Sequence, residues 1–168
     1  MIQQVIKCSN VAVDVEKTIQ SIRHDKLFVL GDEHTRAPCL PLVASANGMD
    51  EAVTIVIPPG DTNKNGAPRH SLLVNLGGGM VTDLGGFAAA TFKRGITYIN
   101  IPTTLLGAVD AAVGGKTGIN FEGYKNEIGA FYPAERVLIS SDFLKSLDHS
   151  AILSGYAEMV KHSLINSA

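Results

Sequence analysis

The chain has 168 residues, and its 14 basic and 16 acidic side chains give a formal net charge of −2. Charged residues make up 18% of the chain and hydrophobic residues 45%, which excludes a disordered tail and a basic nucleic-acid-binding arm. The two cysteines form no C-x-x-C pair, the N-terminus has no signal-peptide pattern, and no apolar run approaches the ~20 residues of a membrane span. These features favour a cytoplasmic globular protein of about one domain.

Short apolar runs alternate with helical stretches along the chain. In order, the sequence predicts a helix over 11–22, strands over 26–30, 52–57 and 71–76, a helix over 81–92, a strand over 97–101, a helix over 103–113, a strand over 136–140, a short helix over 143–147 and a helix over 151–165. Continuous β-branched runs are typical of strands covered on both faces. The alternation therefore predicts an α/β fold, a Rossmann-like parallel sheet with flanking helices.

One connection between predicted strands is unusually short. Only six residues separate Lys64 from Ser71, whereas a parallel crossover needs at least ~10–12 residues. The intervening segment, 65–70, contains a glycine and a proline and cannot supply a helix. Either these two strands are not connected as a crossover, or residues are missing from the sequence.

Glycines gather in the middle of the chain, where fourteen of the seventeen lie between Gly60 and Gly129. Such clustering indicates tight turns and close backbone approach to a ligand. The run 77–83, GGGMVTD, follows a predicted strand and opens a predicted helix, a place that suits a pyrophosphate. The strict G-x-G-x-x-G pattern fails because Thr82 stands at its last glycine, so close helix–sheet packing is the alternative explanation.

Lysines recur beside the later glycines. Lys116 lies in the run VGGKTGIN (113–120) and Lys125 follows it, an arrangement in which ammonium and backbone N–H groups converge on phosphate oxygens. A solvated surface lysine is the commoner interpretation of either residue alone, but their joint placement favours an anion site. The run is not a P-loop, because the upstream glycine of that motif would fall on Asp110.

The last predicted helix carries Glu158, Lys161 and His162 on one face. A metal pair formed by Glu158 and His162 is conceivable. A helical surface pair is the simpler interpretation of the spacing alone.

Together these motifs resemble the 3-dehydroquinate synthase family. The resemblance runs from about Ser71 to Ile165 and is carried by GGGMVTD (77–83), FKRG (92–95), IPTTLLGAVDAAVGGKTGIN (101–120), KNEIGAFYP (125–133), DFLKSL (142–147) and SGYAEMVKH (154–162). Glycerol-1-phosphate and glycerol dehydrogenases share the fold and the glycine turn, but they lack the combination of VGGKTGIN and GAF.

The resemblance implies a Rossmann-like NAD-binding domain over 1–147 and the first helix of a helical metal and substrate domain over 148–168. It implies a lyase that uses catalytic NAD and a divalent metal, zinc or cobalt. The expected substrate is a phosphorylated sugar acid, 3-deoxy-D-arabino-heptulosonate 7-phosphate (DAHP), converted to 3-dehydroquinate and phosphate in the shikimate pathway. A homodimer is also implied, and no nucleic-acid or membrane partner is expected.

The resemblance assigns roles to individual residues. The metal ligand falls on Glu158, whereas His162 stands where the family has an aromatic residue and is not expected to be a ligand. The substrate contacts, expected to be catalytic, fall on Arg94, Asp110, Lys116, Lys125, Asn126 and Lys161. The cofactor contacts fall on Asp32, Glu33, His34, Asp61, Lys64, Gly79, Met80, Val81, Thr82, Asp83, Thr103, Thr104, Lys116, Lys125, Phe143, Leu144, Lys145 and Ser146.

Two departures from the family stand out. The family's Gly-Glu-x-x-Lys turn matches residues 60–64 with Asp61 in place of glutamate, and the helix that follows this turn in the family is absent. The family's two metal-binding histidines would fall beyond residue 168, so we expect the chain alone to be inactive. A related polyol dehydrogenase and an α/β module without chemistry are the alternatives. The phosphate-binding lysines disfavour the first, and the convergent polar residues disfavour the second.

Overall fold

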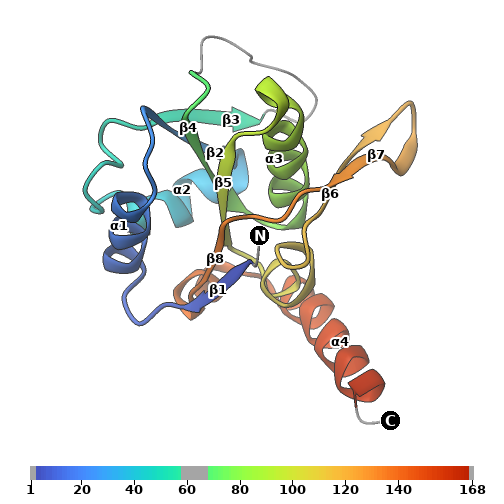
Figure 1. The fold of residues 1–168 in the computed structure, drawn as a ribbon. Helices are drawn as coiled ribbons and strands as arrows, with labels where there is room; N and C mark the ends of the chain where they lie inside the picture. Colours follow the sequence, from blue (N-terminus) through green and yellow to red (C-terminus); the bar gives the residue numbers. More distant parts are fainter. Residues whose placement is uncertain (1–2, 58–67, 167–168) are drawn as a thin grey trace.

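The computed structural model describes residues 3–57 and 68–166, and most of them surround a six-stranded parallel sheet (Figure 1). The strand order is β1-β8-β5-β4-β2-β3. These strands are β1 (Gln4–Lys7), β2 (Lys26–Asp32), β3 (Val53–Ile57), β4 (Ser71–Gly77), β5 (Thr97–Pro102) and β8 (Arg136–Ile139). Every residue of the central β4 is buried, which explains why its sequence is apolar except at Ser71 and Asn75.

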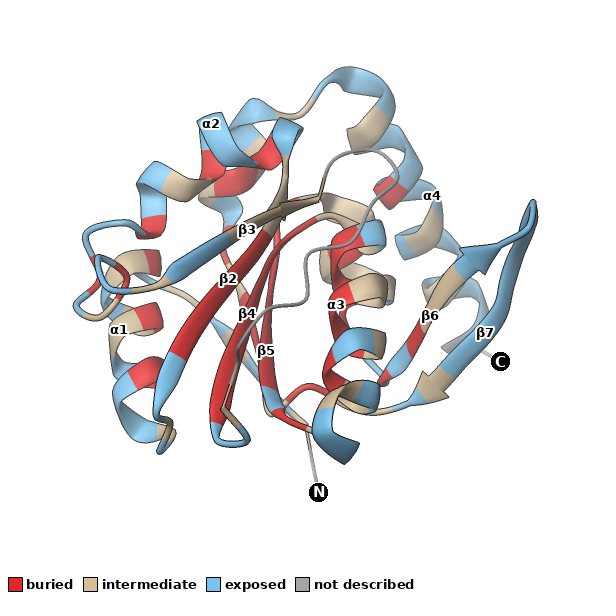
Figure 2. Ribbon diagram, turned by 90° about the horizontal axis from the view of Figure 1, so that it is seen from above, coloured by how far each residue is buried: buried red, intermediate tan, exposed pale blue. Residues whose placement is uncertain are grey.

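Helices cover both faces of the sheet (Figure 2). On one face α1 (Val11–Ser21) and α2 (Glu33–Val43) pack against alternate residues of β2 and β4, including Leu27 and Leu72. On the other face α3 (Gly79–Thr91) packs against the residues between them, including Phe28 and Leu73. This two-sided core confirms the predicted α/β fold with a Rossmann-like parallel sheet.

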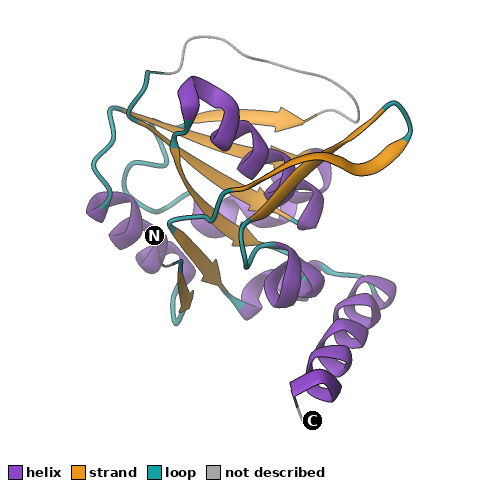
Figure 3. Cartoon of the chain, turned by 45° about the vertical axis from the view of Figure 1, so that its right-hand side comes forward, coloured by secondary structure: helices purple, strands orange, loops and turns teal. Residues whose placement is uncertain are grey.

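The remaining elements lie outside this sandwich. A two-stranded antiparallel hairpin, β6 (Lys116–Phe121) and β7 (Tyr124–Phe131), projects beside α3, and α4 (His149–Asn166) runs away from the sheet (Figures 1 and 3). Three short turns are η1 (Phe92–Arg94), the π-helical η2 (Gly107–Ala111) and the 3₁₀-helical η3 (Ser141–Ser146). The division into domains at residues 147 and 148 stays a prediction.

Several predicted elements need correction. The helix predicted over 103–113 is a shorter turn, in which the Thr104 hydroxyl accepts a hydrogen bond from the Gly107 N–H at 3.0 Å. The short helix predicted over 143–147 is η3, which begins two residues earlier and is capped by Ser140. The strand β1, the helix α2 and the hairpin β6–β7 were not predicted.

The short connection does join two parallel strands. Both β3 and β4 pair in parallel with β2, on its two sides, so these consecutive strands are not neighbours in the sheet. The predicted cofactor contacts Asp61 and Lys64 fall in 58–67, outside the described residues.

Among the described residues, no helix combines the length and the apolar character that crossing a membrane requires.

Candidate functional site

The predicted cofactor residues that the structure describes gather where the strands of the main sheet end. Because all six strands are parallel, their carboxyl ends meet at one edge, as the arrows in Figure 3 show. Asp32 ends β2, Gly78 and Gly79 follow β4, Thr103 and Thr104 follow β5, and η3 follows β8. Ligands of open α/β sheets bind in the crevice outside this edge, so the topology supports a site here.

The glycine turn after β4 leaves the N-terminus of α3 without a side-chain cap. Gly78 is the N-cap residue, and its carbonyl accepts hydrogen bonds from the N–H groups of Val81 and Thr82. A Cβ atom at Gly78 would lie 3.0 Å from Thr104 Cγ2, and one at Gly79 would lie 3.1 Å from Ala111 Cβ. Both interpretations of the turn therefore hold at once: it packs tightly, and it presents uncapped N–H groups that suit an anion.

A cleft of about 520 Å³ adjoins this turn, between α3, η2 and the hairpin. It is lined by four predicted site residues, Asp83, Asp110, Lys116 and Asn126. They come from three separate parts of the chain, so the fold brings together what the sequence placed in separate motifs. Two carboxylates, one ammonium group and one amide are groups that suit a hydroxylated anion.

The hairpin that supplies Lys116 is held against α3 by close packing. A Cβ atom at Gly86 would lie 2.4 Å from Thr117 Cγ2, so only glycine lets β6 approach α3 this closely. The Thr117 hydroxyl donates to the Ala130 carbonyl at 2.8 Å, across the hairpin. These contacts fix the base of β6, where Lys116 lies, beside Asp83 at the cleft.

A buried chain of amides positions the turn that carries Asp110, and it was not predicted. Asn75 donates to the Asn100 side-chain carbonyl at 3.0 Å, and Asn100 donates to the Ala112 carbonyl at 3.1 Å. Both asparagines are at most 3% exposed. In the sequence, the signal for these hydrogen bonds was the presence of Asn75 and Asn100 within otherwise apolar strands, because buried amides require partners.

Burial and, to a smaller extent, the nearby Asp110 carboxylate together raise the pKa of the Asp83 carboxyl to about 6. The folded protein therefore holds a proton on Asp83 more tightly than the unfolded chain, in which the pKa has its ordinary value of 3.8. Below pH 3.8 this proton is present in both states. As pH rises toward about 6, ionisation of Asp83 destabilises the fold, and the loss is complete above that pH.

Replacing Asp83 by asparagine is therefore expected to raise the melting temperature at pH 7 to 8. The gain should shrink as pH falls and vanish below about pH 4, because wild-type Asp83 is then neutral as well. Thermal unfolding followed by circular dichroism across pH 3.5–8 measures it. Asp50→Asn, at an exposed position, is the matched control and should show no such trend. A variant destabilised at pH 7 would contradict the argument.

On the far side of η2, one face of α4 adds a second group of polar residues. Single donor atoms of Asp110, Glu158 and His162 all lie within 4.8 Å of one another. Glu158 also forms an ion pair with Lys161, and its Oε1 atom lies 3.3 Å from His162 Nε2. The predicted metal ligand Glu158 thus has two neighbours that suit a divalent cation, of which the sequence named only His162 as conceivable.

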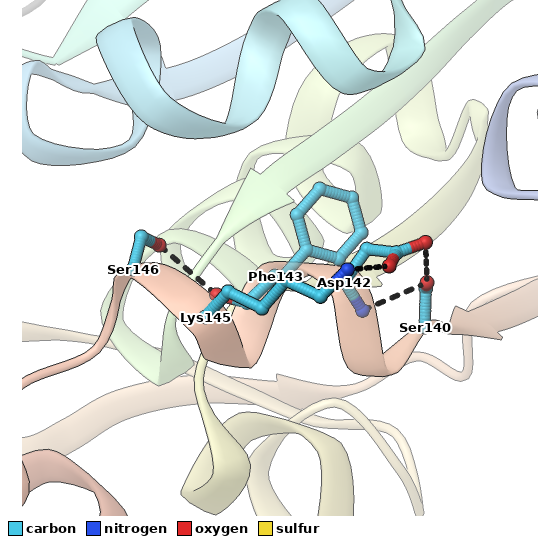
Figure 4. A network of polar contacts seen from close by, with 5 residues as sticks. All are labelled: Ser140, Asp142, Phe143, Lys145 and Ser146. Atoms are coloured by element: carbon cyan, nitrogen blue, oxygen red, sulfur yellow. Dashed lines mark hydrogen bonds and ion pairs between the residues drawn. The ribbon is translucent and has the colours of Figure 1, made fainter.

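Other predicted contacts are occupied or buried in this structure. The Asp32 carboxylate accepts from the Thr35 N–H at 2.8 Å and caps α2, with Glu33 and His34 in the first turn of that helix. Phe143 is fully buried in the core, beside Leu144 in η3. Figure 4 shows the bonds of η3: Lys145 pairs with Asp142, and the Ser146 hydroxyl donates to the Phe143 carbonyl. Val81, Thr82 and Thr103 are also buried, whereas Met80 is exposed.

Three predicted substrate contacts, Arg94, Lys125 and Lys161, are not among the residues that line the cleft. Arg94 follows the C-terminus of α3, about 20 Å along the helix from the glycine turn, and precedes β5 at the opposite edge of the sheet. Lys125 lies on the exposed strand β7 and is not among the residues that line the cleft. Their roles stay predictions.

Comparison with known proteins places the chain in a family. The family profile described as 3-dehydroquinate synthase N-terminal matches residues 53–154. The chain belongs to the 3-dehydroquinate synthase family. It is 53% identical to the 3-dehydroquinate synthase of Parabacteroides distasonis over 179 residues, which cover 98% of this chain and 51% of that enzyme. For the enzyme of Ruminiclostridium cellulolyticum the identity is 39%, covering 90% of this chain and 47% of the relative.

The chain thus spans about half the length of the 3-dehydroquinate synthases that it matches. The alignment with the Parabacteroides enzyme is longer than this chain, so that enzyme has residues within the matched stretch that this chain lacks. This difference agrees with a connection between β3 and β4 that is short by comparison with the family.

Solved structures show the same fold in related enzymes. A 2-deoxy-scyllo-inosose synthase superposes with a TM-score of 0.81 at 26% identity, covering 94% of this chain and 49% of that one. A 2-epi-5-epi-valiolone synthase of Streptomyces hygroscopicus with NAD⁺ and Zn²⁺ bound superposes with a TM-score of 0.76 at 28% identity, covering 96% and 49%. An iron-containing alcohol dehydrogenase of Corynebacterium glutamicum, at 16% identity, shares the fold alone.

Proposed function

We propose that this chain provides the NAD-binding part of a 3-dehydroquinate synthase, a carbon–oxygen lyase that converts DAHP to 3-dehydroquinate and phosphate. The observation that carries the proposal is the 53% identity to a 3-dehydroquinate synthase along nearly the whole chain. The cleft supports it, because four of the residues predicted from the family resemblance line one cavity. The proposal includes the shikimate pathway and a cytoplasmic homodimer.

The residues at the carboxyl edge of the sheet fit an NAD cofactor. The uncapped N-terminus of α3 suits a pyrophosphate, and the glycines of the turn leave room for it. A separate groove lies between α2 and β3 and is lined by Glu33, Arg36, Ala37, Leu40, Pro41, Ala44 and Val56. NAD held here would supply a hydride acceptor, and a divalent metal held by Glu158 would supply a Lewis acid.

The cleft residues would bind and orient the substrate. Lys116 would hold an anionic group of DAHP by a charge-assisted hydrogen bond, and Asn126 would add a neutral donor. Asp110 would accept hydrogen bonds from substrate hydroxyls. Asp83, whose pKa is raised, would be protonated in part of the molecules near pH 6 and could then donate as well as accept.

The test is a chimera in which residues 1–165 are joined to the part of the Parabacteroides enzyme that follows the matched stretch. We expect it to release phosphate from DAHP in the presence of NAD⁺ and Zn²⁺ or Co²⁺, with 3-dehydroquinate as product and no net NADH. Net NADH formation from a polyol without phosphate release would instead indicate a dehydrogenase. Absence of both activities in a folded chimera would reject the proposal.

In the same chimera, replacing Lys116 by methionine is expected to raise KM for DAHP and lower kcat. A hydrogen bond to a charged group contributes about 1.5–3 kcal/mol, which corresponds to a loss of about 10- to 150-fold in kcat/KM. Lys17→Met, which removes an exposed ammonium group on α1, should leave the kinetics unchanged. Kinetics of Lys116→Met equal to those of the unmutated chimera would remove Lys116 from the site.

A further inference from the structure

Two asparagines lie side by side in the main sheet, on the face that α3 covers. Asn75 of β4 and Asn100 of β5 are partners in the strand register. Their exposed fractions are 0% and 3%, and the residues next to them in both strands are apolar and buried. Burying an amide costs free energy unless it is hydrogen-bonded, so a pair of amides in an apolar layer requires an explanation.

The direction of the hydrogen bonds in this pair is fixed at the turn η2. The Ala112 carbonyl can only accept, so the Asn100 amide nitrogen donates to it, at 3.1 Å. The Asn100 side-chain carbonyl then faces Asn75, whose amide nitrogen donates to it at 3.0 Å. This order leaves Asn75 Oδ1, which has no hydrogen-bond partner in the described part of the chain. The pair therefore satisfies a backbone carbonyl of η2 and leaves one of its own acceptors without a donor.

The Asn75 side chain is also fixed on its other side, by α3. A Cβ atom at Gly85 would lie 2.0 Å from Asn75 Oδ1, so only glycine gives the amide room at this position of the helix. Two amide side chains thus join α3, β4, β5 and η2 in series. Folding alone does not require this arrangement, because two apolar side chains of similar total volume would fill the same layer and leave no side-chain acceptor unpaired.

The turn that the amides hold carries Asp110, whose own side chain is exposed and so is not positioned by core packing. Ala112 is buried and is the C-cap residue of η2. Its N–H donates to the Gly107 carbonyl at 2.9 Å, which closes the turn, and its carbonyl accepts from Asn100. The position of Asp110 relative to Asp83, the other carboxylate of the cleft, therefore depends on the tether at Ala112.

We propose that Asn75 and Asn100 are positioning residues for the reaction: through the Ala112 carbonyl they hold Asp110 where it meets the hydroxyl groups of the sugar-phosphate substrate. The proposal rests on the proposed function for the role of Asp110. It extends that function to two residues of the core that are not among those lining the cleft.

Kinetics of the chimera described above test the proposal when the two amides are replaced. Asn100→Val leaves the Asn75 amide without a partner in the core, so the melting temperature should fall. Because Asp110 is then no longer held, KM for DAHP should rise at least about tenfold, with kcat changed by less than about threefold. The double replacement Asn75→Ala with Asn100→Val removes both amides at nearly constant volume, so the melting temperature should recover while KM stays high. The Kd of NAD⁺ should stay within about twofold of the unmutated value in both variants, since the glycine turn is intact.

Ser71→Ala is the matched control for loss of a buried polar group. Ser71 belongs to the same strand, β4, and is 2% exposed. Its hydroxyl donates to the Pro68 carbonyl at 2.7 Å, at the opposite end of the strand from the cleft. The control should lower the melting temperature and leave KM for DAHP unchanged.

A second measurement uses the chain alone and requires no turnover. Carbon NMR follows the titration of the Asp83 carboxyl, whose pKa of about 6 depends in part on the nearby Asp110 carboxylate. When Asp110 is no longer held, we expect this pKa to fall, both in Asn100→Val and in the double variant. It should keep its wild-type value in Ser71→Ala.

An unchanged KM in any folded chimera that lacks the Asn100 amide would overturn the proposal, and so would an unchanged pKa of Asp83 in the folded chain. Either result, together with phosphate release by the unmutated chimera, rejects the positioning role and leaves the proposed function standing. Absence of phosphate release by the unmutated chimera rejects the proposed function instead, and the Asp83 titration then still decides whether the amides hold Asp110.

Discussion

Replacing Gly79 by valine is expected to weaken NAD⁺ binding to the chain by at least about a hundredfold. The first Cβ atom would already lie 3.1 Å from Ala111 Cβ, so the branched side chain cannot turn toward η2. It must instead occupy the space in front of the α3 N-terminus or push the turn away from η2. Either movement removes N–H groups from a pyrophosphate, and hydrogen bonds to charged groups contribute about 1.5–3 kcal/mol each.

Calorimetric titration of the folded variant with NAD⁺ measures this loss. Gly48→Val is the control, since Gly48 has a φ of +94° and lies in the turn before β3, at the opposite edge of the sheet. That variant should be less stable than the wild type, yet while folded it should bind NAD⁺ much as the wild type does. Equal NAD⁺ affinity in Gly79→Val and the wild type would mean that the glycine turn serves packing alone.

Most of the strands that could be predicted are buried along nearly their whole length. Strands β2, β4, β5 and β8 are covered on both faces or nearly so. Burial on both faces favours apolar residues at successive positions, so each of these strands has a mostly apolar sequence. Strand β1 has four residues, three of them exposed, and carries no such run. The hairpin β6–β7 is mostly exposed and rich in glycine, so its residues gave only a turn signal.

The helix α2 was missed because its own sequence opposes a helix. It contains Pro38 and Pro41, which disrupt hydrogen bonding inside helices. The structure overrides this through the capping box of Asp32 with Thr35 and through burial of Cys39 and Val43 against the sheet. Tertiary packing of this kind does not appear in local sequence patterns.

Some features of the candidate site could likewise be predicted from the sequence, and others could not. Residues that follow a strand end, such as Gly79 and Thr104, could be placed at one edge, because parallel strands all end there. The approach of His162 to Asp110 could not be predicted, since it depends on α4 crossing η2 at Gly155. Local sequence patterns do not indicate which distant turn a helix face that contains a glycine will contact.

The chain by itself is expected to release no phosphate from DAHP above the uncatalysed background, even with NAD⁺ and Zn²⁺ present. Asp110 and Lys116 are exposed, so water would enter the cleft and weaken every charged contact with a bound substrate. Large apolar side chains of α4 also face solvent, including Leu164 at 72% and Ile165 at 65% exposure. The relatives are about twice as long as this chain, and the rest of their length is available to cover such surfaces.

The comparison is between the 168-residue chain and the chimera at equal concentrations, by phosphate release and by NAD⁺ calorimetry. We expect NAD⁺ to bind both proteins, because the glycine turn belongs wholly to this chain, and phosphate release only from the chimera. The group formed by Asp110, Glu158 and His162 does not change this expectation, since a substrate in the open cleft would still be exposed to water. Turnover by the chain near that of the chimera would show that Asp83, Asp110, Lys116 and Glu158 suffice, and that closure of the cleft by further residues is not required for catalysis.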